Sequence, residues 1–89
     1  MNKIMKYICV SSSKDYFDKD GNQIAERIKR VLCYSSDIGK HRIYRQNFYN
    51  IEKGMKVFEY KTLKNAQKLC DEINKAYNDD FIPVLKEEK

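Results

Sequence analysis

A chain of 89 residues, 35% of them charged and 42% hydrophobic, is long enough for one small domain and too short for a second core. This composition excludes a disordered chain, and no apolar run approaches the ~18 residues that a membrane-spanning helix needs. Lys6 interrupts the short apolar stretch near the N-terminus, which argues against a signal peptide. We therefore predict a single domain over residues 1–89.

The first half of the chain predicts a strand, a loop and a helix. Residues 4–10 form a short stretch rich in β-branched and aromatic side chains, as in a buried strand. Residues 11–22 are polar, and from Gln23 onward the apolar positions have helical spacing and stop at Gly39. The apolar residues at these positions are Ile24, Ile28, Val31 and Leu32. A hairpin over residues 14–24, turning at Asp20–Gly21, is the alternative, and it would shorten this helix.

The second half predicts two strands, a helix and a last strand. Residues 41–49 are typical of an edge strand, and Gly54 allows a turn that leads into a partner strand at 55–60. Thr62 is a suitable helix N-cap. The helix stripe that follows consists of Leu63, Ala66, Leu69, Cys70, Ile73 and Tyr77. Residues 81–85 form the last strand, and Pro83 places it at a sheet edge because proline has no amide hydrogen to donate.

The predicted order is strand, helix, strand, strand, helix, strand. This is the ferredoxin-like βαββαβ order of an α+β domain, with a four-stranded antiparallel sheet and two helices on one face. We expect the core between sheet and helices to contain Ile8, Val10, Ile28, Leu32, Phe58, Leu69 and Ile73.

Residues 53–60 read Lys-Gly-Met-Lys-Val-Phe-Glu-Tyr, and this stretch resembles the longer signature of the RNA-recognition motif. Lys53, Gly54 and Tyr60 match that signature, and the resemblance extends through the following helix to about residue 85. The two positions whose aromatic rings stack on bases in that family are Met55 and Val57 here. The resemblance therefore implies the ferredoxin-like fold without the usual aromatic platform. The alternative to this resemblance is that Phe58 and Tyr60 are simply core residues of an ordinary sheet.

Positive charge is concentrated in the middle of the chain. Residues 40–64 contain 7 Lys and Arg against 2 acidic residues, whereas residues 71–89 contain 3 against 6. The candidate binding residues in this basic, aromatic stretch are Lys40, His41, Arg42, Tyr44, Arg45, Lys53 and Lys56. Lysine and arginine neutralise phosphates, and tyrosine can stack on bases. Two alternatives stay open, namely a solvated edge strand protected by its charge and a surface for an acidic protein.

Catalytic and metal-binding chemistry has little support in the sequence. Cys9, Cys33 and Cys70 are far apart and lie within apolar patterns, which predicts buried free thiols and a reducing cytoplasm. His41 is the single histidine, so neither a zinc site nor a cysteine–histidine pair is expected. No glycine loop for phosphate is present. We predict a protein that is not an enzyme and needs no metal or cofactor.

Two functions fit these features. We favour a small binding module for nucleic acid or a nucleoprotein, which would be contacted through the basic hairpin at residues 40–56 and through the open face of the sheet. The alternative is an inhibitor of the phage or mobile-element type that blocks a host protein complex, as small inhibitors of CRISPR effectors do. That alternative follows from small size and from a composition rich in Lys, Asn, Ile and Tyr, typical of AT-rich genomes, and not from a motif.

Overall fold

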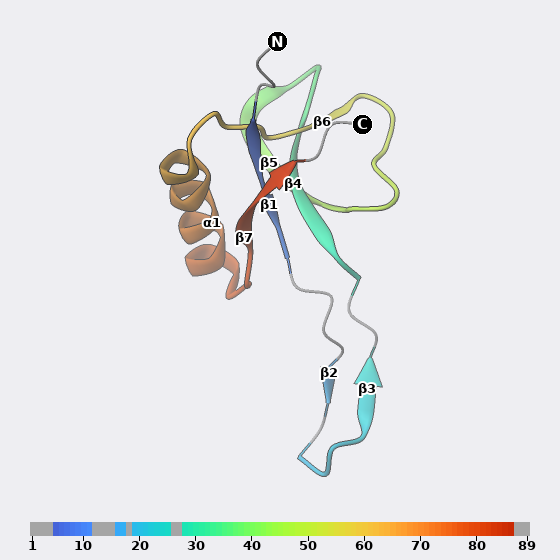
Figure 1. Ribbon diagram of the computed structural model, residues 1–89. Coiled ribbons are helices and arrows are strands. Elements are labelled where there is room, and N and C mark those ends of the chain that lie inside the picture. Colours follow the sequence, from blue (N-terminus) through green and yellow to red (C-terminus); the bar gives the residue numbers. More distant parts are fainter. Residues whose placement is uncertain (1–4, 12–15, 18, 26–27, 87–89) are drawn as a thin grey trace.

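The computed structural model describes residues 5–11, 16–17, 19–25 and 28–86 (Figure 1). Its elements are β1 (Lys6–Val10), β2 (Tyr16–Phe17), β3 (Gln23–Ala25), β4 (Arg30–Ser35), β5 (Gly39–Asn47), β6 (Met55–Val57), α1 (Leu63–Tyr77) and β7 (Ile82–Lys86). A five-stranded antiparallel sheet packs against α1, and β2 and β3 form a separate two-stranded sheet. Three predicted elements are confirmed, namely the strand at 4–10, the helix after Thr62 and the last strand at 81–85. Ile4 lies outside the described residues.

The main sheet has the strand order β5-β4-β1-β7, with β6 also paired to β4. β1 pairs with β7 along its whole length but meets β4 only at Val10 and Val31. β6 pairs with the other half of β4, and Tyr60 then exchanges two backbone hydrogen bonds with Tyr7 of β1, of 2.7 and 2.9 Å. The segment 55–60 therefore fills the space between β1 and β4 where these strands diverge.

The first predicted helix is wrong, because β4 occupies its second half. Val31, Leu32 and Cys33 are consecutive and fully buried, and they contribute to both faces of the sheet. A central strand covered on both faces needs such an unbroken apolar run, which over a short window resembles the spacing of a helix. Ile28, predicted for the core, is 56% exposed. With one helix in the described part of the chain, the ferredoxin-like βαββαβ fold is wrong as well.

The alternative hairpin near Asp20–Gly21 is the arrangement found. β2 and β3 pair antiparallel, and Gly21 between them has a φ of +84° that suits glycine. The hairpin extends away from the sheet and α1 as an arm (Figure 1), which makes the molecule elongated, at 51 × 30 × 26 Å.

The predicted pairing of the strand at 41–49 with the strand at 55–60 is also wrong. β5 and β6 both pair with β4, on its opposite edges. The cause is the wrongly predicted first helix, because part of that segment is β4, the strand with which both β5 and β6 pair. The edge positions of β5 and of β7, with its Pro83, are confirmed.

The helix α1 forms as its sequence predicts. Thr62 is the N-cap, its side chain accepting a 3.3 Å hydrogen bond from the backbone N–H of Asn65. Asn78 ends the helix with a left-handed φ of 55°. The buried stripe consists of Ala66, Leu69, Cys70 and Ile73. Leu63 and Tyr77, also predicted for this stripe, are exposed.

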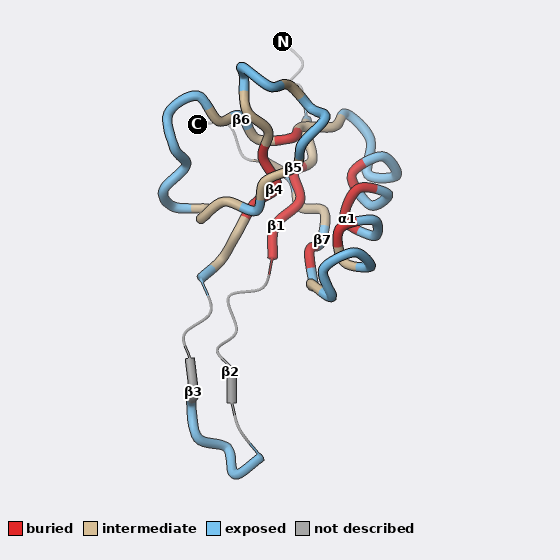
Figure 2. The backbone as a smooth tube through the Cα atoms, turned by 180° about the vertical axis from the view of Figure 1, so that it is seen from behind, coloured by how far each residue is buried: buried red, intermediate tan, exposed pale blue. Residues whose placement is uncertain are grey.

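Two apolar clusters hold the sheet. Figure 2 shows that the buried residues lie mainly along β1, β4 and one side of α1. Between the sheet and α1 lie Cys9, Leu32, Phe58, Ala66, Leu69, Cys70, Ile73 and Phe81. On the opposite face Ile8, Val10, Val31 and Cys33 pack with Phe48, Met55, Val57 and Val84. All three cysteines are buried free thiols, as predicted. The Cys9 thiol donates a 3.3 Å hydrogen bond to the Ala66 carbonyl, and its interaction with Cys70, together with burial, raises its pKa.

Candidate nucleic-acid interface

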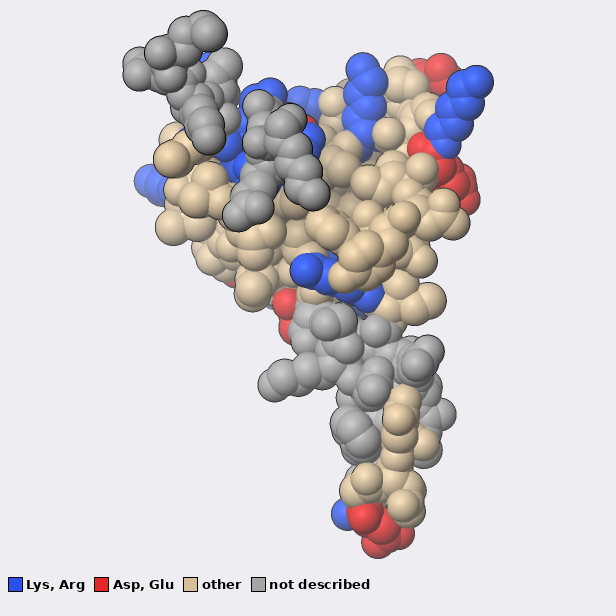
Figure 3. Space-filling model, turned by 45° about the vertical axis from the view of Figure 1, so that its right-hand side comes forward, with Lys and Arg blue, Asp and Glu red and all other residues tan. Residues whose placement is uncertain are grey.

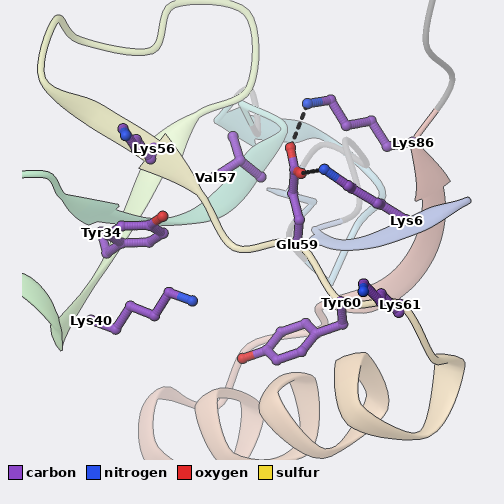
Figure 4. A pocket seen from close by; sticks show the side chains of 9 residues that line it. All are labelled: Lys6, Tyr34, Lys40, Lys56, Val57, Glu59, Tyr60, Lys61 and Lys86. Carbon is purple, nitrogen blue, oxygen red and sulfur yellow. Dashed lines mark hydrogen bonds and ion pairs between the residues drawn. The ribbon is translucent and has the colours of Figure 1, made fainter. Parts of the chain in front are cut away.

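A hollow of about 490 Å³ opens where β1 and β4 diverge (Figure 4). We call it the lysine pocket. It is lined by Lys6, Tyr34, Lys40, Lys56, Val57, Glu59, Tyr60, Lys61 and Lys86. Five of these nine residues are lysines and one is acidic, so the pocket is strongly basic.

The segment between the diverging strands supplies one side of the lysine pocket. Lys56 comes from β6, and Glu59, Tyr60 and Lys61 follow it on the way to α1. Lys6 and Lys86 are paired across β1 and β7, so both amines stand at the same end of the sheet.

The other side of the lysine pocket comes from β4 and β5. The register between these strands shifts between Cys33 and Ser35. Beyond the shift, the Lys40 amine lies 5.4 Å from the centre of the Tyr34 ring. Its side chain extends toward the middle of the pocket, on the side where the hydroxyl of Tyr60 also points (Figure 4).

Charge within the lysine pocket is only partly balanced. The Glu59 carboxylate accepts a 2.6 Å hydrogen bond from Lys86 and lies 3.0 Å from the Lys6 amine. Lys40, Lys56 and Lys61 have no carboxylate partner among the described residues. Three ammonium groups are therefore available to an anion.

The hydrogen bond from Lys86, followed by that from Lys6, lowers the pKa of Glu59 from its ordinary value of 4.5. A carboxylate with a lowered pKa stabilises the fold fully above pH 4.5, and this contribution is lost as the pH falls through the lower folded-state pKa. We therefore expect a Glu59→Gln variant to show a weaker loss of stability between pH 5 and pH 3 than the parent. Urea unfolding at a series of pH values measures this difference, and parallel pH profiles would contradict it.

A second hollow, of about 640 Å³, lies between β5 and α1. We call it the arginine groove. It is lined by Arg30, His41, Arg42, Ile43, Tyr44, Arg45, Gln46, Glu72, Ile73, Ala76 and Tyr77. Arg30 and Arg45 donate to the two oxygens of Asp79, at 2.8 and 3.0 Å. The Arg45 guanidinium also lies 4.0 Å from the centre of the Tyr77 ring, so both arginines already hold α1 and its C-terminal turn against the sheet.

The structure divides the predicted binding residues among three places. Lys40 and Lys56 line the lysine pocket, whereas His41, Arg42, Tyr44 and Arg45 line the arginine groove. Lys53 is exposed in the turn before β6 and lines neither hollow. In the view of Figure 3, most of the visible Lys and Arg side chains stand toward the end of the body opposite the arm.

Lys6, Lys61 and Lys86, together with Tyr34 and Tyr60, are pocket residues that the sequence prediction missed as a group. They are spread over residues 6–86, and no spacing in the chain links them. Lys6 and Lys86 meet only through the register of β1 with β7. Phe58, in contrast, is 4% exposed and belongs to the core, as predicted.

Comparison with family models, with curated proteins and with solved structures found no match for this chain. In the part of the chain that the structure describes, no group of three or more His, Cys, Asp or Glu side chains is placed to hold a metal ion. Over the same residues, no helix is long and apolar enough to cross a membrane. The lysine pocket and the arginine groove are thus the surface features of the described residues that bear on function.

Proposed function

We propose that this chain is a small, non-enzymatic cytoplasmic module that binds nucleic acid or a nucleoprotein through the lysine pocket. The observation that carries the proposal is the unbalanced positive charge of Lys40, Lys56 and Lys61 around a hollow bordered by two tyrosines. Ammonium groups bind phosphate as point charges, and each one that neutralises a phosphate releases counterions from the nucleic acid.

The tyrosines add a second kind of contact. Tyr34 and Tyr60 are partly buried and are held by the Phe58 ring, edge-on to Tyr34 at 4.9 Å and stacked with Tyr60 at 6.4 Å. Aromatic rings fixed in this way favour stacking with bases, because they lose little freedom on binding.

Titration with single- and double-stranded RNA and DNA at several salt concentrations tests the proposal. For the Lys40→Ala/Lys56→Ala variant we expect weaker binding to many sequences alike, because phosphate contacts carry no base information. The slope of log affinity against log salt should fall by about 0.7–0.9 for each lost contact.

The matched control is Lys19→Ala/Lys75→Ala, which removes the same charge from exposed positions outside both hollows. It should leave affinity and slope nearly unchanged. A parent protein that binds none of these nucleic acids at ~50 mM salt would contradict direct binding, and the inhibitor of a host protein complex would then be the function to test.

A further inference from the structure

We infer that the lysine pocket takes the terminal phosphomonoester of a single nucleic-acid strand, at its 5′ or 3′ end. This inference rests on the proposed function and adds the part of the ligand that the pocket recognises. It follows from how the cations are gathered, from the size of the hollow and from the position of Glu59, the one carboxylate among the described residues that line it.

The cations of the lysine pocket come from five separate segments of the fold and border one hollow. Lys6, Lys86, Lys40, Lys56 and Lys61 reach it from β1, β7, β5, β6 and the segment before α1. Internal phosphodiesters carry one negative charge each and are spaced along the strand, so they are matched by a stripe of cations. A phosphomonoester carries close to two charges and three acceptor oxygens on one phosphorus atom at neutral pH. Lysines gathered around one hollow fit that dianion.

The dimensions of the lysine pocket favour a strand end over a duplex. Its volume of about 490 Å³ is in the range of small-ligand sites, so it can accept one terminal unit and not a double helix. With its phosphate among the lysines, the terminal nucleotide would lie beside Tyr34 and Tyr60, which border the same hollow (Figure 4). Stacking on one of these rings would then favour an unpaired base.

Glu59 sets how much charge the lysine pocket offers. Its carboxylate engages Lys6 and Lys86 and leaves three lysines for the ligand. Removing this carboxylate would take away the one negative group among the described residues that line the pocket, and with it the ion pairs to Lys6 and Lys86. A Glu59→Gln variant should therefore bind a phosphate end more tightly than the parent, a gain that partial unfolding cannot produce.

The experiment compares one single-stranded oligonucleotide in three forms, with a 5′-phosphate, a 3′-phosphate or hydroxyls at both ends, by fluorescence anisotropy at fixed salt. We expect one phosphorylated form to bind about tenfold more tightly than the hydroxyl form, the equivalent of about one hydrogen bond to a charged group. Lys40→Ala/Lys61→Ala should reduce this preference to less than about twofold. Glu59→Gln should increase it, and the control Lys19→Ala/Lys75→Ala should keep it.

Equal binding of the three forms would overturn this inference and leave the proposed function in place. An absence of binding to every form would overturn both. A free nucleoside monophosphate that competes as well as the phosphorylated strand would overturn the assignment to a strand end, since the pocket would then read the phosphate of a small molecule.

Discussion

Phe81→Ala is expected to lower the free energy of unfolding by about 3–5 kcal/mol, the range for emptying a buried aromatic site. Phe81 is 1% exposed in the cluster between the sheet and α1. Its backbone N–H donates to the Asn74 side chain at 2.7 Å, and its carbonyl accepts from the same side chain at 2.9 Å. The Arg30 guanidinium lies 5.7 Å from the centre of its ring. Phe81 therefore anchors the turn that leads from α1 into β7.

Urea unfolding of parent and variant, with the slope m compared as well as the midpoint, measures this effect. Tyr49→Ala is the matched control, because Tyr49 is 76% exposed and should lose less than about 1 kcal/mol. Similar losses for the two variants would mean that Phe81 does not lie in the core.

Leu69→Ala is expected to cost about 2–5 kcal/mol, because Leu69 is 7% exposed on the face of α1 that covers the sheet. The removed methyl groups leave a cavity that neighbours on β4 and α1 can fill only in part. Thermal or urea unfolding measures the loss. Since α1 is the one helix in the described part of the chain, this residue tests how the sheet is covered on that side.

Leu63→Ala is the control for this second substitution. It makes the same chemical change in the same helix, at a residue that is 52% exposed, and should change stability by no more than about 0.5 kcal/mol. A cost below about 1 kcal/mol for Leu69→Ala would contradict the packing of α1 described above.

The proposed binding site also predicts how the Phe81 and Leu69 variants should bind nucleic acid. Neither Phe81 nor Leu69 lines the lysine pocket. Their variants, at temperatures where they are fully folded, should therefore bind nucleic acid as the parent does, whereas the lysine variants should fold normally and bind less well. The core variants therefore test the stability of the fold, and the lysine variants test binding.

Local signals in the sequence were sufficient to predict α1, β1 and β7, because the formation of these elements depends mainly on residues that are neighbours in the chain. α1 has an N-cap at Thr62, an apolar stripe and a C-cap at Asn78, all within one segment. β1 and β7 are short apolar strands, and Pro83 alone places β7 at an edge, because its missing amide hydrogen excludes a central position. The burial of the three cysteines followed from the same local patterns.

Only the tertiary structure decided whether residues 30–35 form a helix or a strand. Val31, Leu32 and Cys33 are apolar in a row, which satisfies a helix stripe and a strand buried on both faces equally well over so short a window. The choice depends on α1 covering one face and on Phe48, Met55 and Val57 covering the other. Since β4 then took both β5 and β6 as partners, one ambiguous segment changed the whole sheet order.

The sequence by itself determined that the middle of the chain is basic and that α1 exists. It also identified the four residues of α1 that face the core, although it wrongly added Leu63 and Tyr77 at the two ends of the stripe. The grouping of the cations was decided by the tertiary structure, because it depends on pairings between distant strands. Lys40 and Lys56 lie in the stretch where charge is densest, but Lys6 and Lys86 join them only through the register of β1 and β7. Arg45 carries the same charge and is instead bound to Asp79, a contact between residues 34 positions apart. Composition reports how many charges a chain has, whereas their partners depend on contacts that form only when the chain folds.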